Sequence, residues 1–186
     1  INNVMERSLG YLPELSFSKL SCIVFPEEQM QHPMAHIFGC EPDYNAWSLK
    51  PNHPPRPPNE FLRSAGGHIH VETQEDPIQV VRAMDLFLGV PSILMDNGKE
   101  RRQLYGGPGA HRRKPYGVEY RTLSNFWINK PKFVDWVWDQ TERALQEVAE
   151  HGDDIISNIY SKEIVHCINS GDVYTASNLC ERFDLN

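Results

Sequence analysis

The stretch AGGHIHVE, residues 65–72, alternates polar and aliphatic side chains behind a pair of glycines. Successive side chains of an extended strand point to opposite faces of a sheet. His68, His70 and Glu72 therefore share one face, and the two aliphatic residues between them share the other. The aliphatic face predicts a strand that covers a core, and the polar face is either hydrated or part of a site.

Two further segments have the same alternation. CEPDYNAW, residues 40–47, sets acidic and amide side chains against aromatic and small ones, and GVEYRTL, residues 117–123, sets charged side chains against apolar ones. The polar members are Glu41, Asp43 and Asn45 in the first segment and Glu119 and Arg121 in the second. If the three strands belong to one sheet, these groups line a common concave surface. A half-solvated sheet with a polar wet face is the simpler alternative.

These residue types fit a site that holds hard divalent cations beside a polyanion. Magnesium prefers carboxylate oxygens and water, and arginine matches phosphate oxygens two at a time. Zinc is a rival for His68 and His70, but the two histidines lack the local third and fourth ligands of a compact zinc motif. We therefore expect magnesium, with zinc as the alternative.

Basic residues concentrate between the last two of these strands, in a chain whose net charge is −7. The segment KERRQLYGGPGAHRRKPYG, residues 99–117, carries Lys99, Arg101, Arg102, Arg112, Arg113 and Lys114. Residues 106–117 include four glycines and two prolines, so we expect a loop there. Beside Glu119 and Arg121 such a loop suits a phosphate clamp, and a solvated patch or an RNA contact is the alternative. Neither GxxxxGK[ST] nor GxGxxG occurs in the chain.

The composition argues against several classes of protein. The acidic balance disfavours a general nucleic-acid binder. The four cysteines include no CxxC pair, which indicates reduced thiols rather than a zinc ribbon or a disulfide framework. No apolar run approaches the roughly 20 residues of a membrane span, so we expect a cytoplasmic protein that does not enter a membrane. The chain opens inside what reads as a helix, and we expect an upstream segment to be missing.

The order of the elements predicts an α+β fold. Strands are expected at 16–25, 40–48, 65–72 and 117–123, and helices at about 77–88, 92–104, 131–151, 153–169 and 173–182. Asp76 can cap the first of these helices, and Pro77 suits its first turn. Strands early and helices late favour a curved, mainly antiparallel sheet covered by helices. We expect residues 1–186 to form a single domain whose helical part is 131–186.

The motifs together resemble those of a known superfamily. GGHIHVE, CEPDYNAW and RRQLYGGPGAHRRKPYGVEYRTLSNFW (residues 101–127) are similar to segments of the carboxylate-amine ligases of the glutamine synthetase and glutamate-cysteine ligase superfamily. Within it they resemble the phage-encoded branch called COOH.NH2 ligase type 2. The resemblance implies a funnel-shaped sheet that holds ATP with Mg²⁺ or Mn²⁺. It also implies an acyl-phosphate intermediate that an amine attacks to give an amide.

The resemblance also implies roles for individual residues. Glu41, Asp43, His68 and Glu119 would hold metal, His70 would lie near the nucleotide phosphates, and Arg121 would contact the transferred phosphate or the acyl group. One of Arg101 and Arg102, with one of Arg112 and Arg113, would bind phosphates. Glu41, Glu72 and Asp96 are candidates for the general base. The superfamily also draws acidic ligands from a strand near its N terminus, so we expect that strand to be missing.

Partners and rival functions follow from the same residues. A ligase would take small-molecule or peptide amines and carboxylates, homo-oligomers occur in the superfamily, and a phage enzyme would act in the host cytoplasm. One rival is a non-catalytic derivative that uses the basic segment 99–114 to hold nucleic acid or a protein. Another is a metal-dependent phosphate-ester hydrolase, which would turn over without ATP.

Overall fold

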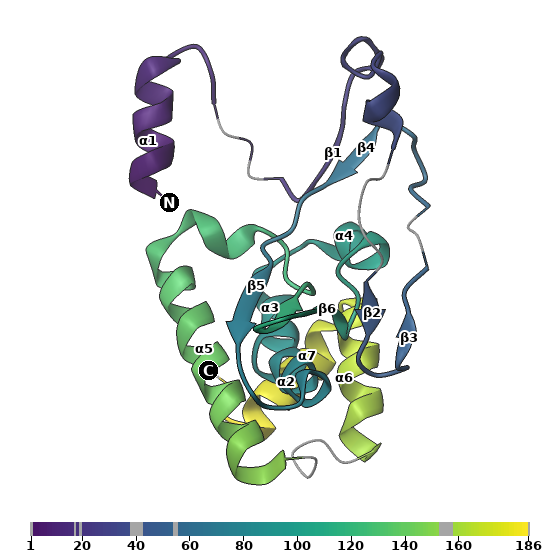
Figure 1. The fold of residues 1–186 in the computed structure, drawn as a ribbon, viewed down its shortest axis with the longest axis vertical. Coiled ribbons are helices and arrows are strands. Elements are labelled where there is room, and N and C mark those ends of the chain that lie inside the picture. Colours follow the sequence, from purple (N-terminus) through teal and green to yellow (C-terminus); the bar gives the residue numbers. More distant parts are fainter. Residues whose placement is uncertain are drawn as a thin grey trace.

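The protein has an α+β fold with antiparallel sheets, as the sequence predicts. The computed structural model describes residues 2–16, 18, 20–37, 43–53, 56–152 and 158–185. Figure 1 shows the main sheet in the middle of the molecule with helices packed around it, and a two-stranded ribbon above. The funnel expected from the superfamily is not established by these elements.

Among the described residues, the main sheet has five strands in the order β3-β2-β6-β7-β5, each antiparallel to its neighbours. The strands are β2 (Tyr44–Asn45), β3 (Lys50–Pro51), β5 (Ile69–Glu72), β6 (Ala110–Lys114) and β7 (Gly117–Tyr120). The ribbon pairs β1 (Cys22–Val24) with β4 (Leu62–Ser64). The first two strands are shorter than the sequence suggested, and residues 38–42 lie outside the described part.

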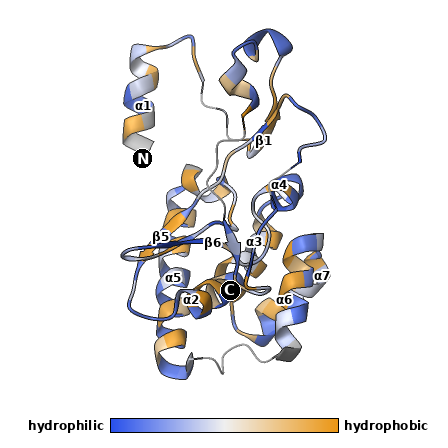
Figure 2. Ribbon diagram, turned by 45° about the vertical axis from the view of Figure 1, so that its right-hand side comes forward, coloured by the Kyte–Doolittle hydropathy of each residue, from blue (hydrophilic) through white to orange (hydrophobic). Residues whose placement is uncertain are grey.

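Helices make up most of the remaining structure. They are α1 (Asn2–Tyr11), α2 (Pro77–Met84), α3 (Val90–Met95), α4 (Lys99–Leu104), α5 (Pro131–His151), α6 (Asn158–Ser170) and α7 (Val173–Arg182), with short 3-10 turns at Glu27–Gln29, Pro33–His36 and Phe126–Asn129. The Asp76 carboxylate accepts from the Ile78 amide at 2.9 Å, so the predicted cap is confirmed. The outer helices α5 and α6 carry both hydrophobic and hydrophilic residues, as amphipathic helices do (Figure 2).

The core helix differs from the two helices expected over 77–104. A π-helical turn, Asp85–Gly89, joins α2 to α3, and the helix then ends at Met95, before α4 begins at Lys99. In the described part of the chain, Pro77–Met95 is the one helical stretch long and apolar enough to span a membrane by length and composition. However, 72% of its apolar window is buried inside the molecule, as in the core helix of a folded domain.

The prediction of a loop at 106–117 was wrong, because β6 runs through its middle. The glycines and prolines fall at the two ends of this strand and not inside it. Gly109, with φ of +73°, precedes the strand, and Pro115 and Tyr116 turn the chain between Lys114 and its partner Gly117. The basic residues therefore alternate between the two faces of a β-hairpin.

Candidate functional site

The strand register gathers the predicted polar residues on one face of the main sheet. His70, Glu119 and Arg112 are directly opposite one another on β5, β7 and β6. Directly paired residues project to the same face of an antiparallel sheet. Val71, Val118 and Tyr120 project to the other face, where they are buried in the core. We call the face that carries His70, Glu119 and Arg112 the polar face.

Glu119 is the centre of the polar face. Its carboxylate is almost fully buried, with 4% of the side chain exposed, and it is surrounded by cations. Lys114 Nζ lies 3.0 Å from Oε2, Arg112 Nη1 lies 3.8 Å from Oε1, and Arg121 Nη1 donates to Oε1. Burial alone would raise the pKa of Glu119, but the hydrogen bond from Lys114 and the charge of Arg121 outweigh it and lower the pKa to about 2. Glu119 is therefore ionised at neutral pH.

Arg121 connects Glu119 to Asp43, which directly precedes β2. Its Nε donates to Asp43 Oδ2 at 3.1 Å, and Asp43 Oδ1 accepts from Asn52 Nδ2 at 2.9 Å. The guanidinium is buried and thus held in one orientation. Glu119, Arg121, Asp43, His68, Arg112 and Lys114 form a group that we call the Glu119 cluster.

His68 joins the cluster as a neutral imidazole. Its Nδ1 lies 3.0 Å from Glu119 Oε1 and 3.3 Å from Arg121 Nη1. Burial, together with the charges of Arg121 and Arg101, lowers the pKa of His68 to about 4. A neutral ring keeps a lone pair available to a ligand.

His70 and Glu72 lie on the same face but outside the cluster. The His70 ring contacts the Tyr116 hydroxyl through Nδ1, and both His70 and Glu72 are exposed on the edge strand β5. Arg113 follows Arg112 on β6 and therefore points away from the polar face, where it is exposed. Of these two arginines the structure brings Arg112 to the cluster.

A comparison with known protein families matches residues 57–158, just over half of the chain, to the family described as Phage phiEco32-like COOH.NH2 ligase-type 2. The chain belongs to this COOH.NH2 ligase family. The matched region contains β5, β6 and β7 and most of the Glu119 cluster. No curated protein and no solved structure gives a match.

In this member of the COOH.NH2 ligase family Arg101 is built into the fold. It is 1% exposed, and its guanidinium donates to the backbone carbonyls of Ala65, Thr122 and Arg121 at 3.0, 2.9 and 3.0 Å. Cβ atoms added at Gly66 and Gly106 would lie 2.3 Å and 1.9 Å from its Nη atoms. Gly66, the first glycine of GGHIH, therefore makes room for the buried Arg101. The phosphate contact expected of Arg101 has no support in this geometry.

Arg102 is likewise engaged away from the cluster. Its Nη1 pairs with Asp96 Oδ2 at 3.3 Å, and both side chains are largely buried between α3 and α4. This pairing occupies Asp96, which was one candidate for the general base. Glu41, another candidate and an expected metal ligand, lies outside the described residues.

Asp85 is a buried polar residue that the sequence analysis missed. Its carboxylate accepts from Trp47 Nε1 at 2.7 Å, from the Tyr120 hydroxyl at 2.8 Å, from the Thr122 hydroxyl at 3.0 Å and from the Gly109 amide. Burial raises the pKa of Asp85 to about 6, although these donors act in the opposite direction. The single acid inside the apolar run VVRAMDLFLGV was the sequence signal that could have identified it.

The described residues around Glu119 do not fit the metal expected of the family. The described residues contain no group of three or more His, Cys, Asp and Glu side chains placed to share an ion. The carboxylates of Asp43 and Glu119 both pair with Arg121, and Glu119 also pairs with Lys114. Three cations against two carboxylates fit an anion better than a resident divalent cation, so no resident metal is assigned to this cluster.

Proposed function

We propose that this chain is an ATP-dependent ligase that joins a carboxylate to an amine through an acyl phosphate. The observation that carries the proposal is the Glu119 cluster, in which Arg112, Lys114 and Arg121 surround one buried carboxylate. All four of these residues lie in the region that matches the family. Such a cluster suits the binding of a transferring phosphoryl group, because fixed cations stabilise charge that spreads over its oxygens.

The chemistry explains why a ligase would need these side chains. A carboxylate is a poor acyl donor because its leaving group would be oxide. In the proposed reaction a carboxylate oxygen attacks the terminal phosphorus of ATP, and ADP leaves. The amine nitrogen then attacks the acyl carbon, inorganic phosphate leaves, and the nitrogen loses a proton to a base.

We assign the residues of the Glu119 cluster as follows. Arg112 and Lys114 bind and orient the phosphoryl oxygens, and Glu119 holds both cations in place. Arg121, fixed by Asp43, contacts the acyl phosphate, and neutral His68 offers a lone pair beside it. We assign Glu72 as the base that accepts the proton of the amine. Glu72 is exposed on the polar face, and no salt bridge of Glu72 is found among the described residues.

A single assay tests the proposal. ADP formation is measured with ATP, Mg²⁺ and a panel of acids and amines, each omitted in turn. The proposal expects continued ADP formation only when acid, amine and ATP are all present, and no more than a single turnover of ADP when the amine alone is omitted. ADP formed without an acid, or phosphate released from esters without ATP, would instead indicate a hydrolase.

The non-catalytic alternative receives less support from the hairpin. Nucleic acid binds best to a continuous basic surface. The alternation of β6 places Arg112 and Arg113 on opposite faces, and Arg101 is buried. A binding protein should keep its affinity in Glu119→Gln and His68→Ala and lose it when Arg112 and Arg113 are replaced.

A further inference from the structure

A cavity of about 620 Å³ opens beside the Glu119 cluster, along β6 and the β2–β3 hairpin. Sites for small molecules commonly have volumes of ~300–1,000 Å³. Four consecutive residues of β6 line it: His111, Arg112, Arg113 and Lys114. The cavity therefore has the size of a ligand site, and it shares Arg112 and Lys114 with the cluster.

The charge of this cavity is positive. Arg112, Arg113 and Lys114 are cations, and none of the described residues that line the cavity is acidic. Burial lowers the pKa of His111, and its Nδ1 lies 2.9 Å from the Gly109 carbonyl, so this ring adds a neutral polar wall. A cavity of this charge attracts anions and repels the ammonium form of an amine.

Apolar side chains also line the cavity, and one of them belongs to a strained residue. They are those of Tyr44, Leu49 and Ile78. Leu49 has a φ of 57°, in the left-handed region that branched and bulky side chains rarely adopt, and it is 65% exposed. An exposed leucine contributes little to the core, so the fold itself gives no reason for this residue at a strained position. Contact with the apolar part of a ligand would give one.

We propose that this cavity binds the acid substrate of the ligase, a carboxylate attached to an alkyl or aryl group. The identity of the ligand as a substrate rests on the proposed function, whereas the binding itself does not. Arg113 receives the carboxylate, and Leu49 and Tyr44 contact its apolar part. Lys114 lines the cavity and lies 3.0 Å from Glu119, so it connects the bound acid to the cluster.

The experiment measures binding without catalysis. Phenylpropionate and hexanoate are titrated into the 186-residue chain in EDTA without nucleotide, and ligand-observed NMR gives the dissociation constants. Phenylpropanol and phenylpropylamine are the neutral and cationic counterparts of the aryl acid. The inference expects both acids to bind, the alcohol to bind at least about tenfold more weakly, and the amine not to bind.

Two variants test the charged and the apolar lining of the cavity. Arg113→Gln should weaken both acids at least about tenfold, because an interaction with a charged group is lost. Leu49→Asn should weaken phenylpropionate and leave the thermal midpoint unchanged or higher, since asparagine tolerates the left-handed conformation. Both side chains are exposed, so neither variant is expected to unfold the chain.

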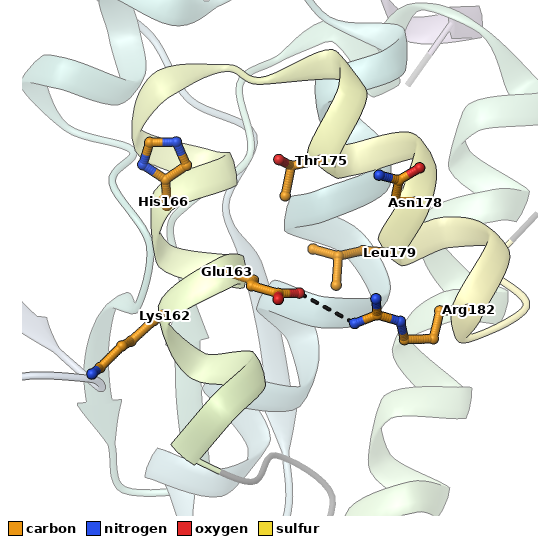
Figure 3. A pocket seen from close by; sticks show the side chains of 7 residues that line it. All are labelled: Lys162, Glu163, His166, Thr175, Asn178, Leu179 and Arg182. Carbon is orange, nitrogen blue, oxygen red and sulfur yellow. Dashed lines mark hydrogen bonds and ion pairs between the residues drawn. The ribbon is translucent and has the colours of Figure 1, made fainter.

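A second cavity provides the matched control. It measures about 330 Å³ and lies between α6 and α7, where Glu163 and Arg182 pair across it and Lys162 lies at its rim (Figure 3). Lys162→Gln removes one cation from the chain, as Arg113→Gln does, but from the other cavity. It should leave the affinity for both acids unchanged.

The outcomes separate this inference from the proposed function. The inference would be overturned if neither acid binds, or if Arg113→Gln and Lys162→Gln have equal effects on the affinity for the acids. Complete competition between ATP and phenylpropionate would also overturn it, because the cavity would then be a nucleotide site. If the acids bind as expected but no acid and amine pair yields ADP, the cavity stands and the ligase proposal fails. If ADP forms but Arg113 and Leu49 do not affect acid binding, the ligase proposal stands alone.

Discussion

Lys114 Nζ lies 3.0 Å from Glu119 Oε2, although Lys114 is not the residue directly opposite Glu119 in the hairpin. The direct partner of Lys114 is Gly117, which has no side chain and so leaves the lysine free to extend diagonally. Arg112, the direct partner of Glu119, occupies the other side of the carboxylate. The turn at Pro115 and Tyr116 therefore determines which cations surround Glu119.

The first prediction concerns the charge of Glu119. Glu119→Gln keeps the shape of the side chain but leaves Arg112, Lys114 and Arg121 without their shared anion. We expect ADP formation to fall at least about 100-fold, because the phosphoryl-binding cations lose their fixed positions. We expect the free energy of unfolding, measured in urea, to fall by about 1–3 kcal/mol, below the usual cost of breaking a fully buried pair because Lys114 is partly exposed.

Glu163→Gln is the matched control for this prediction. Glu163 pairs with Arg182 at 3.2 Å, but both side chains are almost half exposed. Loss of an exposed pair should cost less than about 1 kcal/mol and leave ADP formation unchanged. Equal losses of stability in the two variants would show that the Glu119 cluster contributes no more than a surface ion pair.

The second prediction follows from the pKa of Glu119, which falls from 4.5 to about 2 on folding. A lowered pKa contributes stability that is present above the unfolded value and is lost as the pH falls through the folded value. Wild-type protein should therefore lose stability between about pH 4.5 and pH 2 more steeply than Glu119→Gln does. Urea unfolding across this range measures the difference, and parallel curves would contradict the assignment.

The alternation in AGGHIHVE and GVEYRTL was enough to predict two strands and the face that each polar side chain takes. The structure places His68 and Glu119 3.0 Å apart on that face. The choice between Arg112 and Arg113 depended on where the turn after Lys114 begins, because a shift of one residue exchanges the two faces. The number of glycines and prolines in residues 106–117 did not show at which residue this turn begins.

Other features were beyond the sequence because their partners are distant. Arg101 is held by carbonyls of Ala65, Arg121 and Thr122, which only the folded sheet brings together. A basic residue in a basic segment gives no sign that it is buried. Asp85 accepts from donors on β7 and on the residues that flank β2, β6 and β7, and the apolar residues around Asp85 in the sequence do not specify these partners.

The third prediction tests the space that Gly66 leaves for Arg101. In Gly66→Ala the new Cβ would lie 2.3 Å from Arg101 Nη2, and three backbone carbonyls prevent the guanidinium from moving aside. We expect the variant to lose about 2 kcal/mol or more of stability, as overpacked sites do. Gly10→Ala is the control, because nothing lies within 4 Å of its Cβ, and a helical alanine should be neutral or stabilising. A Gly66→Ala variant as stable as Gly10→Ala would show that Arg101 is mobile.

The fourth prediction concerns removal of metal. Since the described residues form no group of three metal-binding side chains, Mg²⁺ alone should not raise the thermal midpoint of the protein. ATP with Mg²⁺ should raise it, and EDTA should abolish ADP formation without unfolding the chain. A large rise with Mg²⁺ alone would indicate a preformed metal site and would point to Glu41, outside the described residues, as one of its ligands.

The fifth prediction concerns Asp85, whose carboxylate joins the core helix to Gly109, Tyr120 and Thr122 beside the Glu119 cluster. Its pKa rises from 3.8 to about 6 on folding because it is buried. A raised pKa stabilises the folded protein below the unfolded value, and this contribution is lost as the pH rises through about 6. Asp85→Asn cannot titrate, and it turns an amide donor toward groups that are themselves donors, so we expect a loss of about 1–3 kcal/mol.

The pH dependence distinguishes this role of Asp85 from a general packing defect. The stability gap between wild type and Asp85→Asn should narrow as the pH rises from about 4 to about 7, because only the wild type loses stability over that range. Asp172→Asn gives the opposite sign at lower pH, since hydrogen bonds from Thr175 lower the pKa of Asp172 from 3.8 and its contribution is lost only as the pH falls below that value. Urea unfolding of the three proteins at about pH 2, 4 and 7 measures both gaps. A gap for Asp85→Asn that does not change with pH would show that Asp85 keeps one protonation state throughout, and the contacts of its carboxylate would then be purely structural.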